Sequence, residues 1–210
     1  MHSEAWLRMR SVPAQAEDIS TGSRKFARLS SREMKRRPEQ FGNKAPGWPA
    51  LALAIAGDVN GAAKLSDELN RSFPLDTQLQ SYLSPSIRAA VAMGQKNAVN
   101  AVELLRVTSP YDLGTMGSMD PVYLRGQAYL ALANGSAAVA EFQKIIDHPG
   151  VVADSPIGAL ARLGLARAYA LQGDTVKAHA EYQDFLTLWK DADPDIPILK
   201  EASAEYAKLQ

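Results

Sequence analysis

Apolar residues recur at three- and four-residue spacing through most of the chain after residue 50. One clear stretch carries its apolar and small residues at Leu160, Leu163, Ala166, Tyr169, Ala170 and Leu171. That spacing gathers side chains on one face of an α-helix, and Ala and Leu, which are among the best helix formers, are abundant throughout. Apart from residues 150–152, no segment has the apolar pattern of a strand. The pattern therefore predicts an all-α fold.

Regular interruptions divide this helical pattern. Four breaks, of residue types that favour turns, fall at Gly57-Asp58, Gly94-Gln95, Asn134-Gly135 and Gly173-Asp174. Four predicted helix starts carry a capping side chain followed by proline, at Ser84-Pro85, Asp120-Pro121, Ser155-Pro156 and Asp193-Pro194. The first helix, from about residue 49 to 56, is predicted to be short, and a last amphipathic helix is expected from about residue 195 to 209.

Alignment of the breaks reveals an internal repeat. A small residue follows each break, at Ala62, Ala98, Ala138 and Ala178, with separations of 36, 40 and 40 residues. Four residues further on lie Ser66, Val102, Phe142 and Tyr182. A period of 36–40 residues with two helices per unit is typical of stacked helical repeats. We therefore predict a right-handed helical-hairpin solenoid of about four helix pairs, with a C-terminal capping helix.

The repeat resembles the tetratricopeptide repeat over about residues 50–190. The last unit carries the resemblance best, with Leu-Ala-Arg-Ala-Tyr-Ala-Leu-Gln-Gly-Asp at 165–174 followed by Ala178 and Tyr182. The third unit matches through Gly126, Tyr129 and Phe142, whereas the first two units are degenerate. The resemblance implies that the first helices of successive units line a concave groove that binds a protein or peptide.

A second resemblance covers the C-terminal half. Gly-Leu-Ala-Arg-Ala-Tyr-Ala-Leu at 164–171 and Tyr-Gln-Asp-Phe-Leu-Thr-Leu-Trp at 182–189 are similar to the C-terminal region of acidobacterial-type serine/threonine protein kinases and related signalling proteins. In that family a kinase or DNA-binding domain precedes a tetratricopeptide tail. The resemblance implies an alternative function, as a regulatory fragment whose catalytic domain is absent from this chain.

The formal net charge of zero is a sum of two unlike parts. Residues 1–46 carry ten Lys/Arg and five Asp/Glu, a net of +5, whereas residues 47–210 carry thirteen and eighteen, a net of −5. The basic segment has few apolar residues without a sustained period, and we interpret it as a disordered leader that precedes a helical domain at 47–210. The alternative, an arm that binds nucleic acid or an anionic surface, lacks the interleaved aromatic residues typical of such arms.

Candidate catalytic chemistry is sparse. The chain has no Cys, which excludes disulfides, thiol nucleophiles and thiolate metal sites. Residues 114–118 contain two glycines but lack the spacing of a phosphate-binding loop, and Asp191, Asp193 and Asp195 lack the Gly and Glu that complete a calcium loop. His2, His148 and His179 have no partners at zinc-site spacing. We expect a non-catalytic protein with no metal and no cofactor.

The predicted groove supplies the candidate binding residues. By register it includes Leu83, Ile87, Val91, Tyr123, Gln127, Ala131, Leu163, Arg167 and Leu171, of which Tyr123, Gln127 and Arg167 are our candidates for partner contact. Tyr111 and Asp112, in a loop between units, are weaker candidates.

These features together predict a protein–protein interaction module. The partner is a protein or peptide whose identity the sequence does not give, and the acidic balance of the helical region argues against nucleic acid. No apolar run is long enough to span a bilayer and no signal peptide is visible, so we expect a cytoplasmic protein without a membrane partner. Whether the array forms a homodimer through its N-terminal face is left open.

Overall fold

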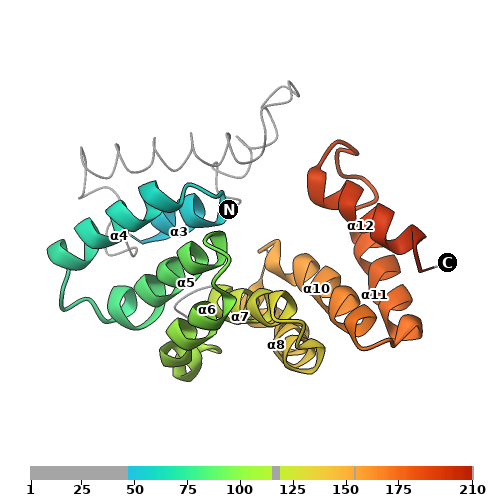
Figure 1. The fold of residues 1–210 in the computed structure, drawn as a ribbon, viewed down its shortest axis with the longest axis horizontal. Helices are drawn as coiled ribbons and strands as arrows, with labels where there is room; N and C mark the ends of the chain where they lie inside the picture. The colour runs from blue at the N-terminus through green and yellow to red at the C-terminus, as the bar shows by residue number, and fades with distance from the viewer. Residues whose placement is uncertain (1–46, 115–118, 154, 210) are drawn as a thin grey trace.

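The computed structural model describes residues 47–114, 119–153 and 155–209, and over these residues the fold is all-α (Figure 1). They form ten α-helices, one π-helix and one 3-10 helix, and none of them lies in a strand. The helices of the N-terminal half are α3 (Trp48–Ile55), α4 (Val59–Ser72), the π-helix η2 (Leu79–Leu83), α5 (Ser84–Gly94), α6 (Ala98–Leu105) and the 3-10 helix η3 (Arg106–Tyr111). Those of the C-terminal half are α7 (Asp120–Ala131), α8 (Gly135–Asp147), α9 (Pro149–Val152), α10 (Ile157–Leu171), α11 (Thr175–Leu188) and α12 (Pro197–Ala207).

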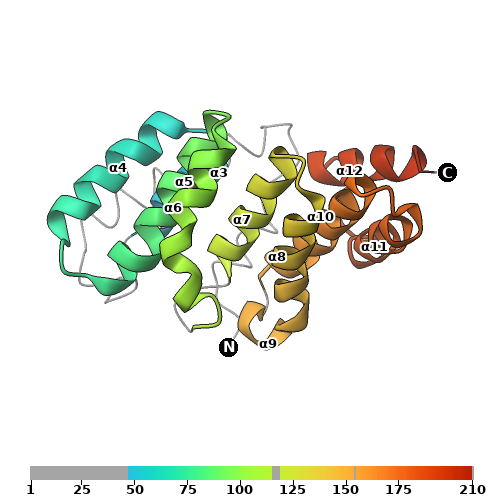
Figure 2. The same ribbon diagram turned by 60° about the horizontal axis from the view of Figure 1, so that its bottom comes forward.

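Neighbouring helices pack in pairs along the chain. The pairs are α3 with α4, α5 with α6, α7 with α8, and α10 with α11. The first helices also contact one another in sequence, α3 with α5, α5 with α7 and α7 with α10. Figures 1 and 2 show the pairs following one another from α3 and α4 at one end to α11 and α12 at the other. Residues 150–152, which carry the apolar pattern of a strand, lie in the short helix α9.

The turn between the two helices of each pair has the same construction four times. A residue with φ between 53° and 80° comes first, at Gly57, Lys96, Ala133 and Gly173. The N-cap residue of the second helix follows, at Asp58, Asn97, Asn134 and Asp174. Each N-cap side chain accepts a hydrogen bond of 3.0–3.2 Å from the backbone N–H three residues later. The backbone N–H of each N-cap residue donates to the carbonyl five residues earlier at 2.9–3.0 Å. This bond gives a partner to a carbonyl group at the C-terminal end of the first helix.

These turns correct the predicted register of the second unit by three residues. Counted from the N-caps, the small residue of the second unit is Ala101, which is fully buried, and not Ala98. The position four residues after the small residue is the buried Leu105 and not Val102. The predicted break at Gly94 misled the alignment, because Gly94 is the last residue of α5 and Lys96 adopts the positive φ of the turn. The corrected separations of the N-caps are 39, 37 and 40 residues.

The α-helix α5 begins at the predicted Ser84-Pro85, but it continues the π-helix η2 without a break and Ser84 does not cap it. The helix already runs through residues 77–83, and its N-terminal cap is Asp76, whose Oδ1 accepts a hydrogen bond of 2.8 Å from the backbone N–H of Leu79. Pro85 has no N–H to donate and its ring crowds the preceding turn. The wider π-turns of η2, in which the N–H of Ser84 reaches the carbonyl of Leu79, accommodate it.

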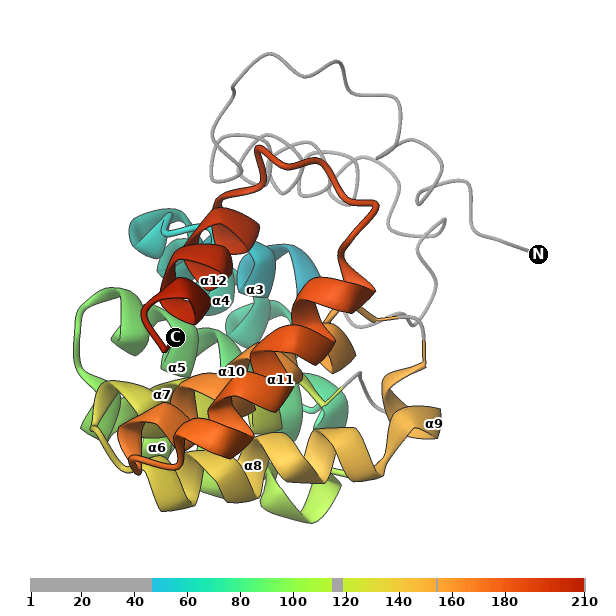
Figure 3. The same cartoon turned by 90° about the vertical axis from the view of Figure 1, so that its right-hand side faces the viewer.

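The predicted start of the last helix is also wrong by two residues. Asp193 caps a turn, since its Oδ1 accepts a hydrogen bond of 2.9 Å from the N–H of Asp195, and α12 begins at Pro197. The helix packs against α11 and closes that end of the molecule (Figure 3). Its apolar face, with Ile198, Leu199, Ala202, Tyr206 and Leu209, joins the same cluster as Phe185 and Trp189.

Close approach between successive pairs depends on glycine. A methyl group added to Gly126 of α7 would lie 2.6 Å from two ring atoms of Phe142 of α8, and one added to Gly164 of α10 would lie 2.5 Å from the same ring. The fully buried ring of Phe142 therefore fits between two helices of successive units. The contact of Phe142 with Gly126 lies within one hairpin, and its contact with Gly164 joins that hairpin to the next.

Candidate interaction surfaces

Two of the three predicted groove residues contact each other on α7. Tyr123 and Gln127, one helical turn apart, are half-buried and joined by a side-chain hydrogen bond. Burial raises the pKa of the Tyr123 hydroxyl, and the positive charge of Arg167 and the bond to Gln127 partly oppose this rise. The tyrosine ring also packs edge-on against Phe142, with ring centroids 5.9 Å apart. Tyr123 therefore contributes to the core as well as to the surface.

Arg167 is held by the last helix. Its Nε lies 2.8 Å from Glu205 Oε2, and its Nη2 lies 2.9 Å from Glu205 Oε1 and 3.4 Å from Glu201 Oε2. The Tyr182 hydroxyl donates to Glu205 at 2.8 Å. Burial tends to raise the pKa of Glu205, but the hydrogen bonds from Arg167 and Tyr182 bring it below its ordinary value. In this structure Arg167 thus fastens α12 to α10 and α11, a role that the sequence did not reveal.

The remaining positions of the predicted groove divide between core and surface. Leu83, Ile87 and Leu163 are at most 1% exposed and belong to the packed interior, whereas Ala131 and Leu171 are exposed. The register correction also moves the second-unit positions to Ser86, Ala90 and Gly94. The structure thus places Tyr123, Gln127 and Arg167 near one another, and contact of these residues with a partner stays a prediction.

Asp112 is not available to a partner. It is 6% exposed and accepts a hydrogen bond from Arg125, which is 4% exposed. Arg125 also donates to Glu141 and to the Thr108 hydroxyl, each at 3.0 Å. Lys144 completes the group with a bond of 3.0 Å to Asp112. The cluster ties η3 and the segment after it to α7 and α8, because a buried charge is stable only when it is paired.

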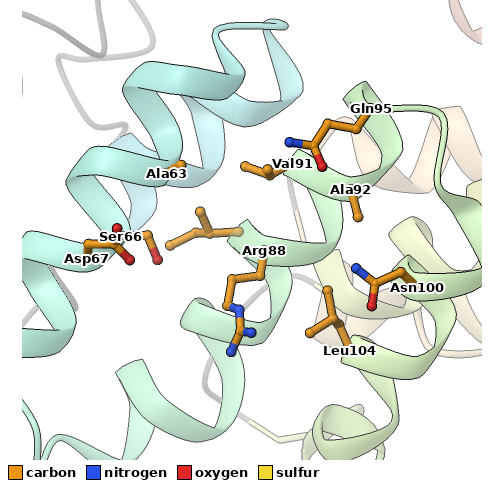
Figure 4. Close-up of a pocket in the computed structure, with 10 residues that line it drawn as sticks. Ala63, Ser66, Asp67, Arg88, Val91, Ala92, Gln95, Asn100 and Leu104 are labelled. Carbon is orange, nitrogen blue, oxygen red and sulfur yellow. The ribbon is translucent and has the colours of Figure 1, made fainter.

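A cleft of about 240 Å³ opens between α4 and α6, which both pack on α5 (Figure 4). Its walls are formed by Ala63, Ser66 and Asp67 of α4, by Ile87, Arg88, Val91 and Ala92 of α5 with its C-cap Gln95, and by Asn100 and Leu104 of α6. Small residues on α4 and α5 leave the space, and polar side chains stand at its rim. Arg88 is exposed, and within the described residues its guanidinium has no hydrogen bond or ion pair. This cleft was not predicted, because its walls come from three helices and only the corrected register brings them together.

The remaining chemical candidates are structural or lie outside the described residues. His148 caps α8, with its Nδ1 2.8 Å from the carbonyl oxygen of Lys144. The ring of His179 packs 4.6 Å from the ring of Tyr206. No group of three His, Asp or Glu side chains in the described part of the chain is arranged to hold a metal ion. Among the same residues, no helix has the length and apolar character needed to cross a membrane. His2, the leader 1–46 and residues 115–118 of the glycine-containing loop lie outside the described residues.

Comparison of the chain with protein-family models, with curated proteins and with solved structures finds no match. The resemblances to tetratricopeptide repeats and to the kinase C-terminal region therefore stay predictions. The geometry of the described residues is the basis for the function proposed below.

Proposed function

We propose that this protein is a non-catalytic interaction module, a right-handed solenoid of four helix hairpins that resembles the tetratricopeptide repeat. The fourfold repetition of one turn, with a positive φ residue followed by an Asp or Asn N-cap, is the observation that carries the proposal. Turns repeated at intervals of 37–40 residues set each hairpin to the same geometry, and contacts between successive first helices stack the hairpins. Such arrays present an extended surface built from equivalent helix positions.

The proposed contact surface is the face of the first helices around Tyr123 and Gln127. Gln127 is half-buried and carries both donors and an acceptor, which suits recognition of a peptide backbone. Arg167 adds positive charge beside Tyr123, although Glu201 and Glu205 engage it in this structure. The partner that fits this face is therefore a polar peptide or protein segment whose hydrogen-bonding groups reach Gln127.

A peptide-display selection against the full chain tests this proposal. We expect the selection to enrich peptides whose binding is weakened at least about fivefold by Gln127→Ala, which removes hydrogen bonds and leaves the helix intact. Gln143→Ala on the exposed side of α8 serves as the matched control, since Gln143 bonds only its neighbour Asp147 among the described residues. The proposal fails if no peptide is enriched, or if Gln127→Ala and Gln143→Ala bind every selected peptide as the unaltered chain does.

Arg167 is unsuitable as a simple test of the contact surface. Its replacement by alanine removes the bonds to Glu205 and frees α12, so that lost binding and lost structure would be confused. Conservative replacement by lysine keeps the charge while losing the two-point contact of the guanidinium with Glu205. Binding by Arg167→Lys therefore reports on charge at this face, provided that the melting temperature is measured on the same sample.

A further inference from the structure

Arg88 and Arg125 occupy the same position in successive repeats. Each lies nine residues before the N-cap that starts the second helix of its pair, Asn97 for Arg88 and Asn134 for Arg125. Arg125 lies against Asp112 and Glu141 and is buried, with its charge neutralised by these two carboxylates. In the third repeat the arginine at this position thus receives carboxylates from outside its own helix.

The equivalent carboxylates are missing around Arg88, and Asp67, which also lines the cleft, forms no ion pair with it within the described residues. Glu141 lies seven residues after its N-cap, and the equivalent residue in the preceding repeat is Leu104. Thr108, which also bonds Arg125, corresponds to Leu69 in the first repeat. Arg88 therefore lines the cleft between α4 and α6, and its guanidinium has no ion-pair partner among the described residues.

We propose that the α4–α6 cleft binds an acidic segment of a partner protein, in which a carboxylate pairs with Arg88. The partner supplies in trans what Asp112 and Glu141 supply to Arg125 within the chain. Figure 4 shows the amides of Gln95 and Asn100 directed over the space between the helices, where they can bond the backbone of the segment. The hydroxyl of Ser66, in a residue only 4% exposed, lines the same cleft and has no hydrogen bond within the described residues.

The length of the cleft suits a short extended segment. Arg88, Val91 and Ala92 of α5 and its C-cap Gln95 line one side of the cleft over seven residue steps, which is roughly 10 Å at the helical rise of 1.5 Å. An extended chain advances about 3.3 Å per residue, so three residues span this length. Val91 and Leu104 supply apolar surface for the side chains beside the carboxylate.

This cleft is separate from the first-helix face. Successive residues of an α-helix are turned by about 100°, and the cleft residues of α5 centre on Arg88. Ser86, Ala90 and Gly94 lie on the opposite side of the helix. These three are the equivalents of the groove positions Tyr123, Gln127 and Ala131. Binding in the cleft and binding at Gln127 can therefore be tested separately, and the failure of one does not exclude the other.

Peptide titration of the full chain, uniformly labelled with ¹⁵N, tests the proposal. The probe is acetyl-Ala-Val-Glu-Val-Ala-amide, and the matched peptides carry Gln or Lys in place of Glu. We expect saturable shifts of backbone amides in α4, α5 and α6 around the cleft, with the Glu peptide bound about three- to fivefold more tightly than the Gln peptide, as a partly exposed ion pair provides. The Lys peptide is expected to bind most weakly.

Two substitutions locate the interaction. Arg88→Gln should remove the preference for Glu over Gln, whereas Arg106→Gln, at an exposed arginine paired with Glu103, should leave it unchanged. Leu104→Glu places a carboxylate at the position equivalent to Glu141, so it should pair with Arg88 and abolish binding of the Glu peptide. Asp67→Asn, on the facing wall, should not weaken binding. Equal affinity for the three peptides, preference for the Lys peptide, or a Glu preference that survives both Arg88→Gln and Leu104→Glu would overturn the proposal.

Discussion

Replacement of Gly164 by alanine tests how tightly successive hairpins are packed. The added methyl carbon would lie 2.5–2.7 Å from three ring atoms of Phe142, whereas ordinary contacts begin near 3.4 Å. The ring cannot simply move aside, because Gly126 of α7 also lies so close that a methyl group there would be 2.6 Å from the ring. α8 and α10 must therefore separate by several tenths of an ångström.

The magnitude follows from two opposing effects. Overpacking a well-packed core costs about 1–3 kcal/mol, and alanine is favoured over glycine inside a helix by about 1 kcal/mol. We expect Gly164→Ala to lower the free energy of unfolding by about 1–2 kcal/mol. Urea denaturation followed by circular dichroism at 222 nm measures the change.

A double-mutant cycle isolates the cause. Phe142→Leu removes the far end of the ring, so in that background Gly164→Ala should become neutral or stabilising, with a coupling of at least about 1 kcal/mol. Gly150→Ala is the matched control, because a methyl group there meets no other atom within 4 Å. A Gly164→Ala protein as stable as the unaltered chain, or a loss that persists with leucine at 142, would refute the packing argument.

Four further predictions follow from the same contacts. Asp112→Ala should lower the free energy of unfolding by about 3 kcal/mol because it leaves Arg125 partly unpaired in the interior; Glu103→Ala, at an exposed ion pair, should cost less than about 0.5 kcal/mol in the same urea titration. The pKa of Glu205 lies below its ordinary value of 4.5, so its stabilisation is present above that value and is lost as the pH falls through the lower pKa of the folded protein. Thermal melts should accordingly show Glu205→Gln less stable than the unaltered chain at pH 7, with the difference shrinking below about pH 4. Ala178→Leu, at a fully buried position, should cost about 1–3 kcal/mol through overpacking, measured by urea denaturation, and an unchanged midpoint would contradict its close packing. Limited trypsin digestion should remove the leader and leave a core that begins near residue 47, and survival of the intact chain under conditions that cleave a denatured control would contradict the predicted boundary.

The sequence predicts the helices well because their signals are local. Apolar residues at three- and four-residue spacing and the caps at Asp58, Asn134 and Asp174 act within a few residues. The predicted position of the second turn is wrong because Lys96 adopts a positive φ, a conformation that glycine usually adopts. Backbone hydrogen bonds of the turn hold Lys96 in this conformation, and composition alone does not reveal it.

The candidate sites are harder to predict because their decisive contacts are distant in sequence. Arg167 meets Glu205 across 38 residues, and the loop residue Asp112 meets Lys144 across 32. Arg88 and Arg125 have similar helical surroundings, yet one is exposed and the other buried. The difference comes from residues on neighbouring hairpins, so only the packed structure distinguishes a buried ion pair from an open charge.

Stacking of successive hairpins is tested most directly by nuclear Overhauser contacts to the ring of Phe142. The structure predicts that one and the same ring contacts the Hα protons of Gly126 in α7 and of Gly164 in α10, since both backbones approach it closely. Observation of both contacts in the full chain would place three helices of two successive hairpins around one side chain. A contact with Gly126 alone would describe an isolated hairpin and contradict the stacked array.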